Sequence, residues 1–576
     1  MTSSNAPDTD TKPHWLWWLV GAVGLLYFWG LDNIYMPTNG DEMVYAHIAR
    51  LTAASGHWLP LVSELDDMRN TKPPLLFWQS MVVSGWGQYW HLWLLRLPSL
   101  LYLALVSIGM CLLLHRWLGE WKTAAWAVLC LLLCWGSFRY GRPYLTTAPE
   151  MFWYSLAPAY VCWRSAQAQH RVILNTPEEW LRWSVLGVLT GVGLAYKSFA
   201  LVVPVALGVW VMRLLLQPPV TRRDLLVSVL QTAWLSVLAL AFFACWLLID
   251  PQPQEVWREF VQRENAGKLN DSQGYWAFLF SWRGSGDYLS APLQNMGLLF
   301  PWCVGLIGVA WQHRQLRRQD WQGNLSAALL AWIVVWCVVF VLPSQRSSRY
   351  LLPVMPALAM LMALHVRSFH KAVSVSVAVL SLLMLSVLVW LGWHAHVLGL
   401  LPSPWWEMLC LSLLLALGLC LRMSWLATAQ ALQGLFCAAL ALMGLNCLLH
   451  GMSAERTAFV GHESQRPHAE TVWVPPGFNG EFERLQFLLP GANRFVPDQN
   501  KVNAFSDAID RSSGAWFIVD RPAGSPALPC ETMQVCERIA VRWDIEQRLK
   551  PGQVNAANAG RPSEWLWRQE WLMRMR

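Results

Sequence analysis

Two short polar motifs lie in the first hydrophilic segment of the chain, just after its first apolar stretch. They are residues 40–45, GDEMVY, and residues 71–74, TKPP. Adjacent carboxylates beside an apolar stretch are costly if they are drawn toward lipid, so function is the first hypothesis for them. A helix cap is the alternative, because carboxylates also suit the start of a helix. We interpret Asp41 as a candidate catalytic carboxylate.

Further charged and aromatic residues are predicted to share one membrane face with these motifs. A carboxylate can take a proton from a hydroxyl group, and cations can stabilise a departing phosphate. Arginine suits phosphate well, because its planar guanidinium offers two parallel donors. This set predicts a reaction with an anionic, lipid-bound reactant, and its members are Asp41, Glu42, Tyr45, Arg50, Lys72, Arg139, Arg142, Glu150, Lys197, Glu264, Lys268, Arg346, Arg349 and Tyr350.

The composition indicates a polytopic membrane protein. Of the 576 residues 55% are hydrophobic and only 14% are charged, against roughly 25% charged residues in soluble proteins. The net charge of +7 is modest and is spread among the loops, so membrane lipids are expected partners and nucleic acid is not. We expect neither a metal nor a cofactor, because no cysteine–histidine cluster with zinc spacing and no phosphate-binding loop occurs.

Apolar windows predict about thirteen transmembrane helices in residues 1–449. The first loop, residues 33–91, is predicted to hold a helix at Asp41–Ser55 and an interfacial helix at Leu75–Gly85. The expected spans are 15–32, 93–114, 123–138, 148–163, 183–196, 198–216, 225–249, 291–311, 325–342, 350–366, 373–391, 406–421 and 425–449.

The distribution of basic residues predicts the orientation. Alternate loops carry basic clusters and should be cytoplasmic, so the loops at 33–91, 250–290 and 343–349 face outward together with the tail. Five basic residues oppose this rule, which indicates a bound phosphate; snorkelling to lipid headgroups is the alternative. They are Arg139, Arg142, Lys197, Arg346 and Arg349.

The tail, residues 450–576, is predicted to be a small soluble α/β domain. Its apolar runs are too short to span a membrane, and they alternate with turn residues. Cys530 and Cys536 could form a disulfide outside the cytoplasm, or remain free thiols. The expected strands are Thr471–Val474, Ala515–Asp520 and Arg538–Trp543, and the expected helices are Gly480–Leu489 and Lys501–Ser512.

The order of several motifs resembles one family of membrane enzymes. Gly40–Ala46, Ala54–Trp58, Lys72–Leu75 and Leu95–Ser99 follow the first span in turn, and Tyr350–Pro353 comes late in the chain. This order resembles the ArnT and protein O-mannosyltransferase group of the GT-C glycosyltransferases. The long loop after the seventh span and the soluble tail are similar to the ArnT layout.

The resemblance implies a GT-C fold and sugar transfer at the outer face of a bacterial cytoplasmic membrane, with the tail in the periplasm. The donor would be a polyprenyl-phosphate-linked sugar, and the acceptor a lipid, a glycan or a protein. Asp41 would deprotonate or orient the acceptor while polyprenyl phosphate leaves with inversion. Lys72 would meet the donor phosphate, and Tyr45 and Tyr350 would line the donor site. Further substrate-binding candidates are Glu42, Arg139, Arg142, Lys268, Arg346 and Arg349.

The chain also departs from the family pattern at three places. ArnT-like proteins often have Glu before Lys-Pro-Pro, Asp-Met-Pro at the fourth span and Glu-His after the seventh. Here these are Thr71, residues 147–149 (TAP) and Glu264-Asn265. Because Thr and Asn replace metal ligands poorly, the departures argue against a zinc site and predict a sugar or acceptor other than aminoarabinose on lipid A.

Two other classes compete with a sugar transferase. A secondary transporter would show inverted repeats and broken helices at mid-membrane, and neither is evident in the sequence. An O-antigen-type polymerase or ligase would work at the same face with a pyrophosphate-linked donor. The Lys-Pro-Pro motif after a single long loop favours a monophosphate donor instead.

Overall fold

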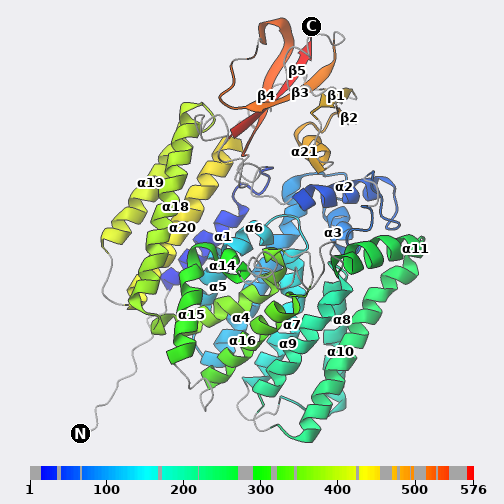
Figure 1. Ribbon diagram of the computed structural model, residues 1–576, viewed down its shortest axis with the longest axis vertical. Coiled ribbons are helices and arrows are strands. Elements are labelled where there is room, and N and C mark those ends of the chain that lie inside the picture. The colour runs from blue at the N-terminus through cyan, green and yellow to red at the C-terminus, as the bar shows by residue number, and fades with distance from the viewer. Residues whose placement is uncertain are drawn as a thin grey trace.

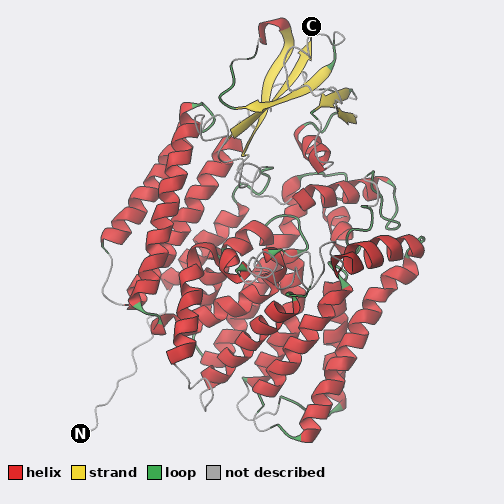
Figure 2. Cartoon of the chain, in the orientation of Figure 1, coloured by secondary structure: helices red, strands yellow, loops and turns green. Residues whose placement is uncertain are grey.

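A bundle of helices with one β-sheet at one end forms the fold (Figure 1). The computed structural model describes residues 14–34, 40–64, 68–166, 172–217, 220–269, 290–312, 321–342, 347–422, 427–453, 467, 470–475, 480–492, 494–497, 514–526, 528, 530–543 and 567–575. Figure 2 shows that helices make up the body of the molecule and that strands are confined to the C-terminal end.

Each expected span coincides with one or more apolar helices. The membrane part consists of α1 (His14–Phe28), α4 (Leu92–Leu118), α5 (Trp121–Leu133), α6 (Trp135–Gly141), α7 (Thr147–Ser165), α8 (Pro177–Leu194), α9 (Val202–Leu215), α10 (Arg222–Ile249), α14 (Ala291–Met296), α15 (Phe300–Gln312), α16 (Trp321–Val339), α17 (Met355–His365), α18 (Lys371–Val397), α19 (Ser403–Leu421) and α20 (Ala427–Ser453). The predicted boundary after residue 449 lies inside α20, so the helical part extends to Ser453.

Fewer helices of the structure meet the length and hydropathy expected of a membrane span than the number of spans predicted from the sequence. Among the described residues, 7 helices are long and apolar enough to cross a membrane, or 8 if the bent pair α5 and α6 is one span. Three further apolar helices, at Trp15–Phe28, Phe199–Leu215 and Leu325–Val339, are shorter, and α5 and α6 meet at an angle of 61°. The count of about thirteen spans therefore stays a prediction.

Local sequence explains where several of these helices begin and how closely they pack. Thr221 caps α10 and exchanges hydrogen bonds with Asp224 in a capping box. Thr176 caps α8, with Pro177 in the first helical position. Gly191 of α8 packs tightly against α10, since an added Cβ there would lie 2.6 Å from the Phe242 Cβ.

Short elements gather at the end of the bundle nearest the sheet (Figure 1). The first loop contains α2 (Gly40–Ala54) and α3 (Leu75–Val83), which confirms both predicted helices. The segment after α10 forms α11 (Pro253–Val256), followed by η2, a π-helical stretch at Trp257–Asn265. A 3₁₀ segment, η6 (Ser348–Val354), precedes α17.

A five-stranded mixed sheet forms the C-terminal domain. Its order is β2-β1-β3-β5-β4, in which β1 pairs parallel with β2 and β3, while β5 pairs antiparallel with β3 and β4. The elements are β1 (Thr471–Val474), α21 (Gly480–Leu488), β2 (Arg494–Pro497), β3 (Trp516–Pro522), β4 (Met533–Trp543) and β5 (Trp567–Met575). Three of these strands and α21 match predicted elements, although β4 begins before the predicted Arg538. The strands β2 and β5 were missed, and the second predicted helix, at 501–512, lies outside the described residues.

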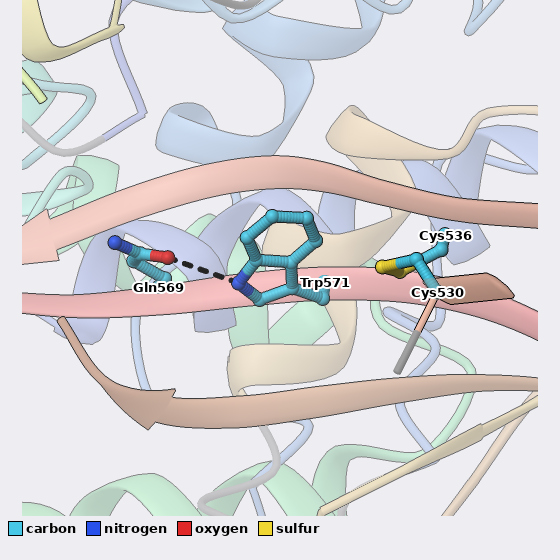
Figure 3. Close-up of a disulfide and its surroundings, with 4 residues drawn as sticks. All are labelled: Cys530, Cys536, Gln569 and Trp571. Atoms are coloured by element: carbon cyan, nitrogen blue, oxygen red, sulfur yellow. Dashed lines mark hydrogen bonds between the residues drawn. A yellow bond between two sulfur atoms is a disulfide. The ribbon is translucent and has the colours of Figure 1, made fainter. Parts of the chain in front are cut away.

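A disulfide joins Cys530 to Cys536 in this domain (Figure 3). Cys536 lies on β4 opposite Met573 of β5, and Cys530 begins the short turn before β4. Of the two alternatives that the sequence left open, the bonded one is therefore present. The bridge fixes the turn to the edge strand of the sheet.

Candidate functional site

The first part of the site is an ion pair between Asp41 and Arg349. Asp41 lies in the first turn of α2, and Arg349 comes from η6, far away in the sequence. The Arg349 Nη2 donates to Asp41 Oδ2 at 2.6 Å, and the Tyr45 hydroxyl donates to the same oxygen at 3.4 Å. The Asp41 side chain keeps 39% of its surface exposed, so the paired carboxylate stays accessible.

A second ion pair brings Lys72 to the same place. Lys72 Nζ lies 2.8 Å from Glu264 Oε1 of η2 and donates to the Thr71 carbonyl at 2.7 Å. It also lies 5.8 Å from the centre of the Tyr45 ring. Because the Lys72 side chain is only 10% exposed, its ammonium is held within the protein rather than in solvent.

A third pair joins Lys197, in the turn after α8, to Glu150 in the first turn of α7. Lys197 Nζ is 2.9 Å from Glu150 Oε1 and 4.7 Å from the centre of the Tyr350 ring. Tyr350 follows Arg349 in η6, and the Arg349 guanidinium also lies 5.8 Å from that ring. The third pair is therefore linked to the first through one aromatic side chain.

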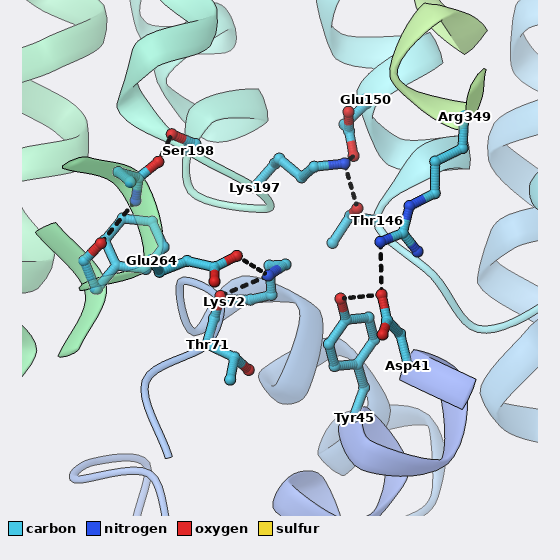
Figure 4. A network of polar contacts seen from close by, with 12 residues as sticks. Asp41, Tyr45, Thr71, Lys72, Thr146, Glu150, Lys197, Ser198, Glu264 and Arg349 are labelled. Carbon is cyan, nitrogen blue, oxygen red and sulfur yellow. Dashed lines mark hydrogen bonds and ion pairs between the residues drawn. The ribbon is translucent and has the colours of Figure 1, made fainter. Parts of the chain in front are cut away.

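Figure 4 shows these three pairs facing one another from separate elements. We call them the charge cluster; its members are Asp41, Lys72, Glu150, Lys197, Glu264 and Arg349. Three cations and three carboxylates balance formally. A phosphodiester that enters the cluster could replace the carboxylates as the partner of the three cations. Binding by cations in this way is what an anionic, lipid-linked reactant requires.

The ionisation of Asp41 reflects these neighbours. Burial by itself raises the pKa of the Asp41 carboxyl, but Arg349, together with Lys72 and Lys197, outweighs it and the pKa lies below its usual value. Burial raises the pKa of Tyr45 well above its usual value, so its hydroxyl keeps the proton that it donates. Asp41 is therefore a carboxylate at neutral pH.

Glu42 points away from the charge cluster although it is adjacent to Asp41. It is fully buried, and Arg96 of α4 donates to both of its oxygens at 2.7 and 2.9 Å. The Tyr144 N–H also donates to Glu42 at 2.7 Å, and Arg96 donates to the Leu31 carbonyl. These contacts anchor α2 to the bundle, and the substrate-binding role predicted for Glu42 stays a prediction.

Arg142 and Arg139 are also placed by aromatic and main-chain groups. Arg142 is fully buried, donates to the Trp29 carbonyl and to Asn446 Oδ1, and lies 4.9 Å from the Phe138 ring centre. It is therefore part of the bundle core, and its predicted substrate-binding role stays a prediction. Arg139 lies over the ring of Tyr140 at 5.4 Å, and its substrate-binding role stays a prediction.

Two predicted substrate-binding residues fall outside the description. Arg346 lies outside the described residues, and for Lys268 only the backbone is described. At the positions that depart from the family pattern, Asn265 accepts from the Ser198 hydroxyl at 2.6 Å and donates to the Phe260 carbonyl. Within the described ranges no group of three or more His, Cys, Asp or Glu side chains is arranged to hold a metal ion.

Sequence reasoning singled out Glu150, Lys197 and Glu264 as outward polar residues, and it suggested a role, phosphate binding, only for Lys197. For Glu150 and Lys197 the signal that could have identified them is a charge at the end of an apolar helix, whereas Glu264 lies in the polar stretch Trp257–Asn265 and has no such signal. Arg96 lies in the Leu95–Ser99 motif, but no role was predicted for it. Its only signal in the sequence is a charge inside an apolar span.

Comparisons with known proteins agree with this architecture. No family model matches the chain. It is 26% identical over 333 residues to the undecaprenyl phosphate-α-4-amino-4-deoxy-L-arabinose arabinosyl transferase of Erwinia tasmaniensis, covering 56% of this chain and 54% of that one. A second such transferase, from Proteus mirabilis, is 25% identical over 60% of this chain and 59% of its own length. The match thus spans little more than half of these relatives.

A solved structure extends the likeness to the whole chain. The crystal structure of ArnT from Cupriavidus metallidurans bound to undecaprenyl phosphate has a TM-score of 0.57 and 16% identity, covering 97% of this chain and 98% of that one. The fold is therefore ArnT-like from the first membrane helix to the C-terminal sheet. The resemblance predicted from the motifs is confirmed.

Proposed function

We propose that this ArnT-like chain is a membrane glycosyltransferase that takes a sugar from a polyprenyl-phosphate donor at the periplasmic face of a bacterial inner membrane. The observation that carries the proposal is the charge cluster, in which three cations and the accessible Asp41 carboxylate face one another. The arabinosyl transferases to which the chain is similar are named for such a donor. The acceptor is a lipid, a glycan or a protein.

The proposed reaction is a displacement with inversion. The donor phosphate is bound by Lys72, Lys197 and Arg349, and Asp41 accepts the proton of the acceptor hydroxyl. The hydroxyl oxygen attacks the anomeric carbon, the bond from that carbon to the phosphate oxygen breaks, and polyprenyl phosphate leaves as the anion. The three cations stabilise the charge that develops on the leaving phosphate.

Donor binding also changes what surrounds Asp41 in this scheme. Arg349 is held by Asp41 at 2.6 Å, and the donor phosphate competes for the same guanidinium. When Arg349 turns to the phosphate, Asp41 loses its strongest cationic partner, and its affinity for a proton rises. The carboxylate therefore becomes a better base when the donor is present.

The pH dependence of transfer tests the role of Arg349. Because Arg349 lowers the pKa of Asp41 in the donor-free protein, kcat/KM measured at donor concentrations well below KM should stay level in the wild type as the pH falls from 7 to the ordinary range of an aspartate pKa. In Arg349→Gln the guanidinium that lowers the pKa of Asp41 is absent, so burial raises this pKa and the acid limb of the rate profile should move to higher pH. Initial transfer rates measured across this range check the shift. An unchanged acid limb in a folded Arg349→Gln protein contradicts the coupling.

Two substitutions in one ion pair test the phosphate site. Lys72→Ala should weaken binding of undecaprenyl phosphate by about ten- to a hundredfold, since a charge-assisted contact is lost. Glu264→Gln should strengthen it, because Lys72 no longer has to leave a carboxylate. The exposed Lys122 at the start of α5 provides a control, and Lys122→Ala should bind as wild type. Weakening by both Lys72→Ala and Glu264→Gln would instead indicate a purely structural ion pair.

Cell-envelope glycans provide the direct test of the proposed activity. Mass spectrometry should compare a deletion strain, its wild-type complement and an Asp41→Asn complement with matched expression. A sugar that is absent from the deletion and the Asp41→Asn strain, and present in the wild-type complement, supports the proposal and its mass indicates the sugar class. Identical glycans, lipid A and proteins in all three strains would count against it.

A further inference from the structure

We infer that Glu483 of the C-terminal domain is a positioning residue that holds α2, and with it Asp41, in place. The inference rests on the proposed function in that Asp41 is taken as the reacting carboxylate. The contact itself does not depend on that role. It joins the last domain of the chain to the first helix of the site.

Glu483 lies on α21 and points into α2. Its side chain is fully buried and accepts hydrogen bonds from Arg50 Nη2 at 2.8 Å and Arg50 Nε at 3.0 Å. The Trp90 indole donates to it at 3.1 Å, and His47 Nδ1 lies 3.3 Å away. Burial alone raises the pKa of Glu483, but these donors outweigh it and the pKa is lowered. The carboxylate is therefore charged where it meets α2.

His47 ties this carboxylate to the rest of the first loop. The Glu64 main-chain N–H donates to His47 Nε2 at 3.5 Å, so the opposite nitrogen carries the proton that reaches Glu483. His47 and Arg50 occupy neighbouring positions on one face of α2, one turn apart. A single carboxylate thus holds two side chains of that helix.

Apolar packing surrounds the polar contact. Val44 and Ile48 of α2 belong to the same buried cluster as Leu485 of α21 and Trp516 of β3. Beside the carboxylate, the rings of Trp90 and Phe487 stack with centroids 6.2 Å apart and an interplanar angle of 8°. The core of the C-terminal domain is therefore continuous with the core of the first loop, and α2 lies between that domain and the bundle.

The arrangement predicts a specific effect on the site. His47 and Arg50 lie about 9 and about 14 Å of helix rise from Asp41. The three cations of the charge cluster come from other elements, since Lys72 precedes α3, Lys197 follows α8 and Arg349 lies in η6. Loosening α2 therefore displaces the carboxylate, whereas the backbone positions of the three cations are fixed by elements other than α2.

The same helix offers a matched control. Arg484, the residue after Glu483, forms a buried ion pair with Glu570 of β5 at 2.7 Å, which stays within the C-terminal domain. Glu570→Gln removes a buried carboxylate of the same kind as Glu483→Gln does, from the same small domain. It leaves the contact with α2 intact.

The experiment compares Glu483→Gln, Glu570→Gln and wild type as full-length protein in detergent micelles and in the complemented deletion strain. Three readouts are needed: amide hydrogen exchange in residues 40–50, binding of undecaprenyl phosphate, and the sugar signal in cells. For Glu483→Gln we expect faster exchange in α2, donor binding within about twofold of wild type, and a sugar signal reduced by about tenfold to a hundredfold. Glu570→Gln should leave exchange in α2 and the sugar signal unchanged.

Two results overturn the inference. One is an unchanged rate of amide hydrogen exchange in α2 of Glu483→Gln, because the Glu483 carboxylate would then not stabilise that helix. The other is an equal loss of sugar signal in Glu570→Gln, which would assign the effect to folding of the C-terminal domain. The exchange arm needs neither the sugar nor the acceptor, so it separates failure of this inference from failure of the proposed function, which the Asp41→Asn strain reports.

Discussion

Replacing Asp41 by Asn is expected to reduce sugar transfer by about a hundredfold to ten-thousandfold, the range of a lost general base. An asparagine amide has nearly the same shape as the carboxylate, but it cannot accept the hydroxyl proton. Arg349 and the Tyr45 hydroxyl can still donate to the remaining side-chain oxygen, so the local structure should persist. Transfer rates with saturating donor measure the loss.

Donor binding distinguishes this effect from general damage to the site. In Asp41→Asn the Arg349 guanidinium no longer has a carboxylate partner, and a donor phosphate meets less competition for it. Undecaprenyl phosphate should therefore bind at least as tightly as it does to the wild type. A variant that transfers sugar at the wild-type rate would remove Asp41 from the mechanism, whereas one that fails to bind donor would assign it to the binding site.

The largest expected effect on stability comes from Arg96→Met. Arg96 and Glu42 are both essentially without solvent contact, and they share a two-pronged ion pair. Removing the arginine leaves Glu42 buried without its counter-charge, which costs about 3 to 5 kcal/mol in comparable pairs. Denaturation of the detergent-solubilised protein should show this loss, and extraction yield should fall with it.

Two comparisons make the Arg96 result interpretable. Glu42→Gln combined with Arg96→Met should recover part of the stability, since the introduced side-chain amide oxygen can still accept the Tyr144 N–H and no charge remains buried. Arg258→Met breaks an exposed pair with Glu255 and should change stability by less than about 1 kcal/mol. If Arg96→Met were no more destabilising than Arg258→Met, the pair would not anchor α2.

The helices of the membrane part could be predicted from sequence because they depend on local signals. Apolar windows mark the spans, and acidic residues followed by helix-forming residues mark α2 almost to the residue. The C-terminal strands β2 and β5 were harder to predict. β2 is short and includes Arg494 and Pro497, and β5 (WRQEWLMRM) mixes charged and apolar residues without a regular alternation.

The site could be predicted only as a set of residue types. Asp41 and Arg349 were both candidates, yet nothing in the sequence indicates that they pair across 308 positions. Glu42 shows a second difficulty. In the sequence, a buried charge that pairs with another residue of the protein cannot be distinguished from a charge that binds a substrate. Which of the two applies depends on packing between elements, as the contact with Arg96 illustrates.

The link between His47 and Glu483 also has a consequence for how the protein is made. The two residues are 436 positions apart, so His47 is synthesised well before Glu483. At bacterial synthesis rates of about 5 to 20 residues per second, α2 leaves the ribosome roughly 20 to 90 s before its partner. During that interval Arg50 and His47 of α2 lack the carboxylate that binds them in the folded protein. A chain that terminated before α21 would keep every member of the charge cluster and still lack Glu483, so α2 can be held in place only after α21 has been synthesised.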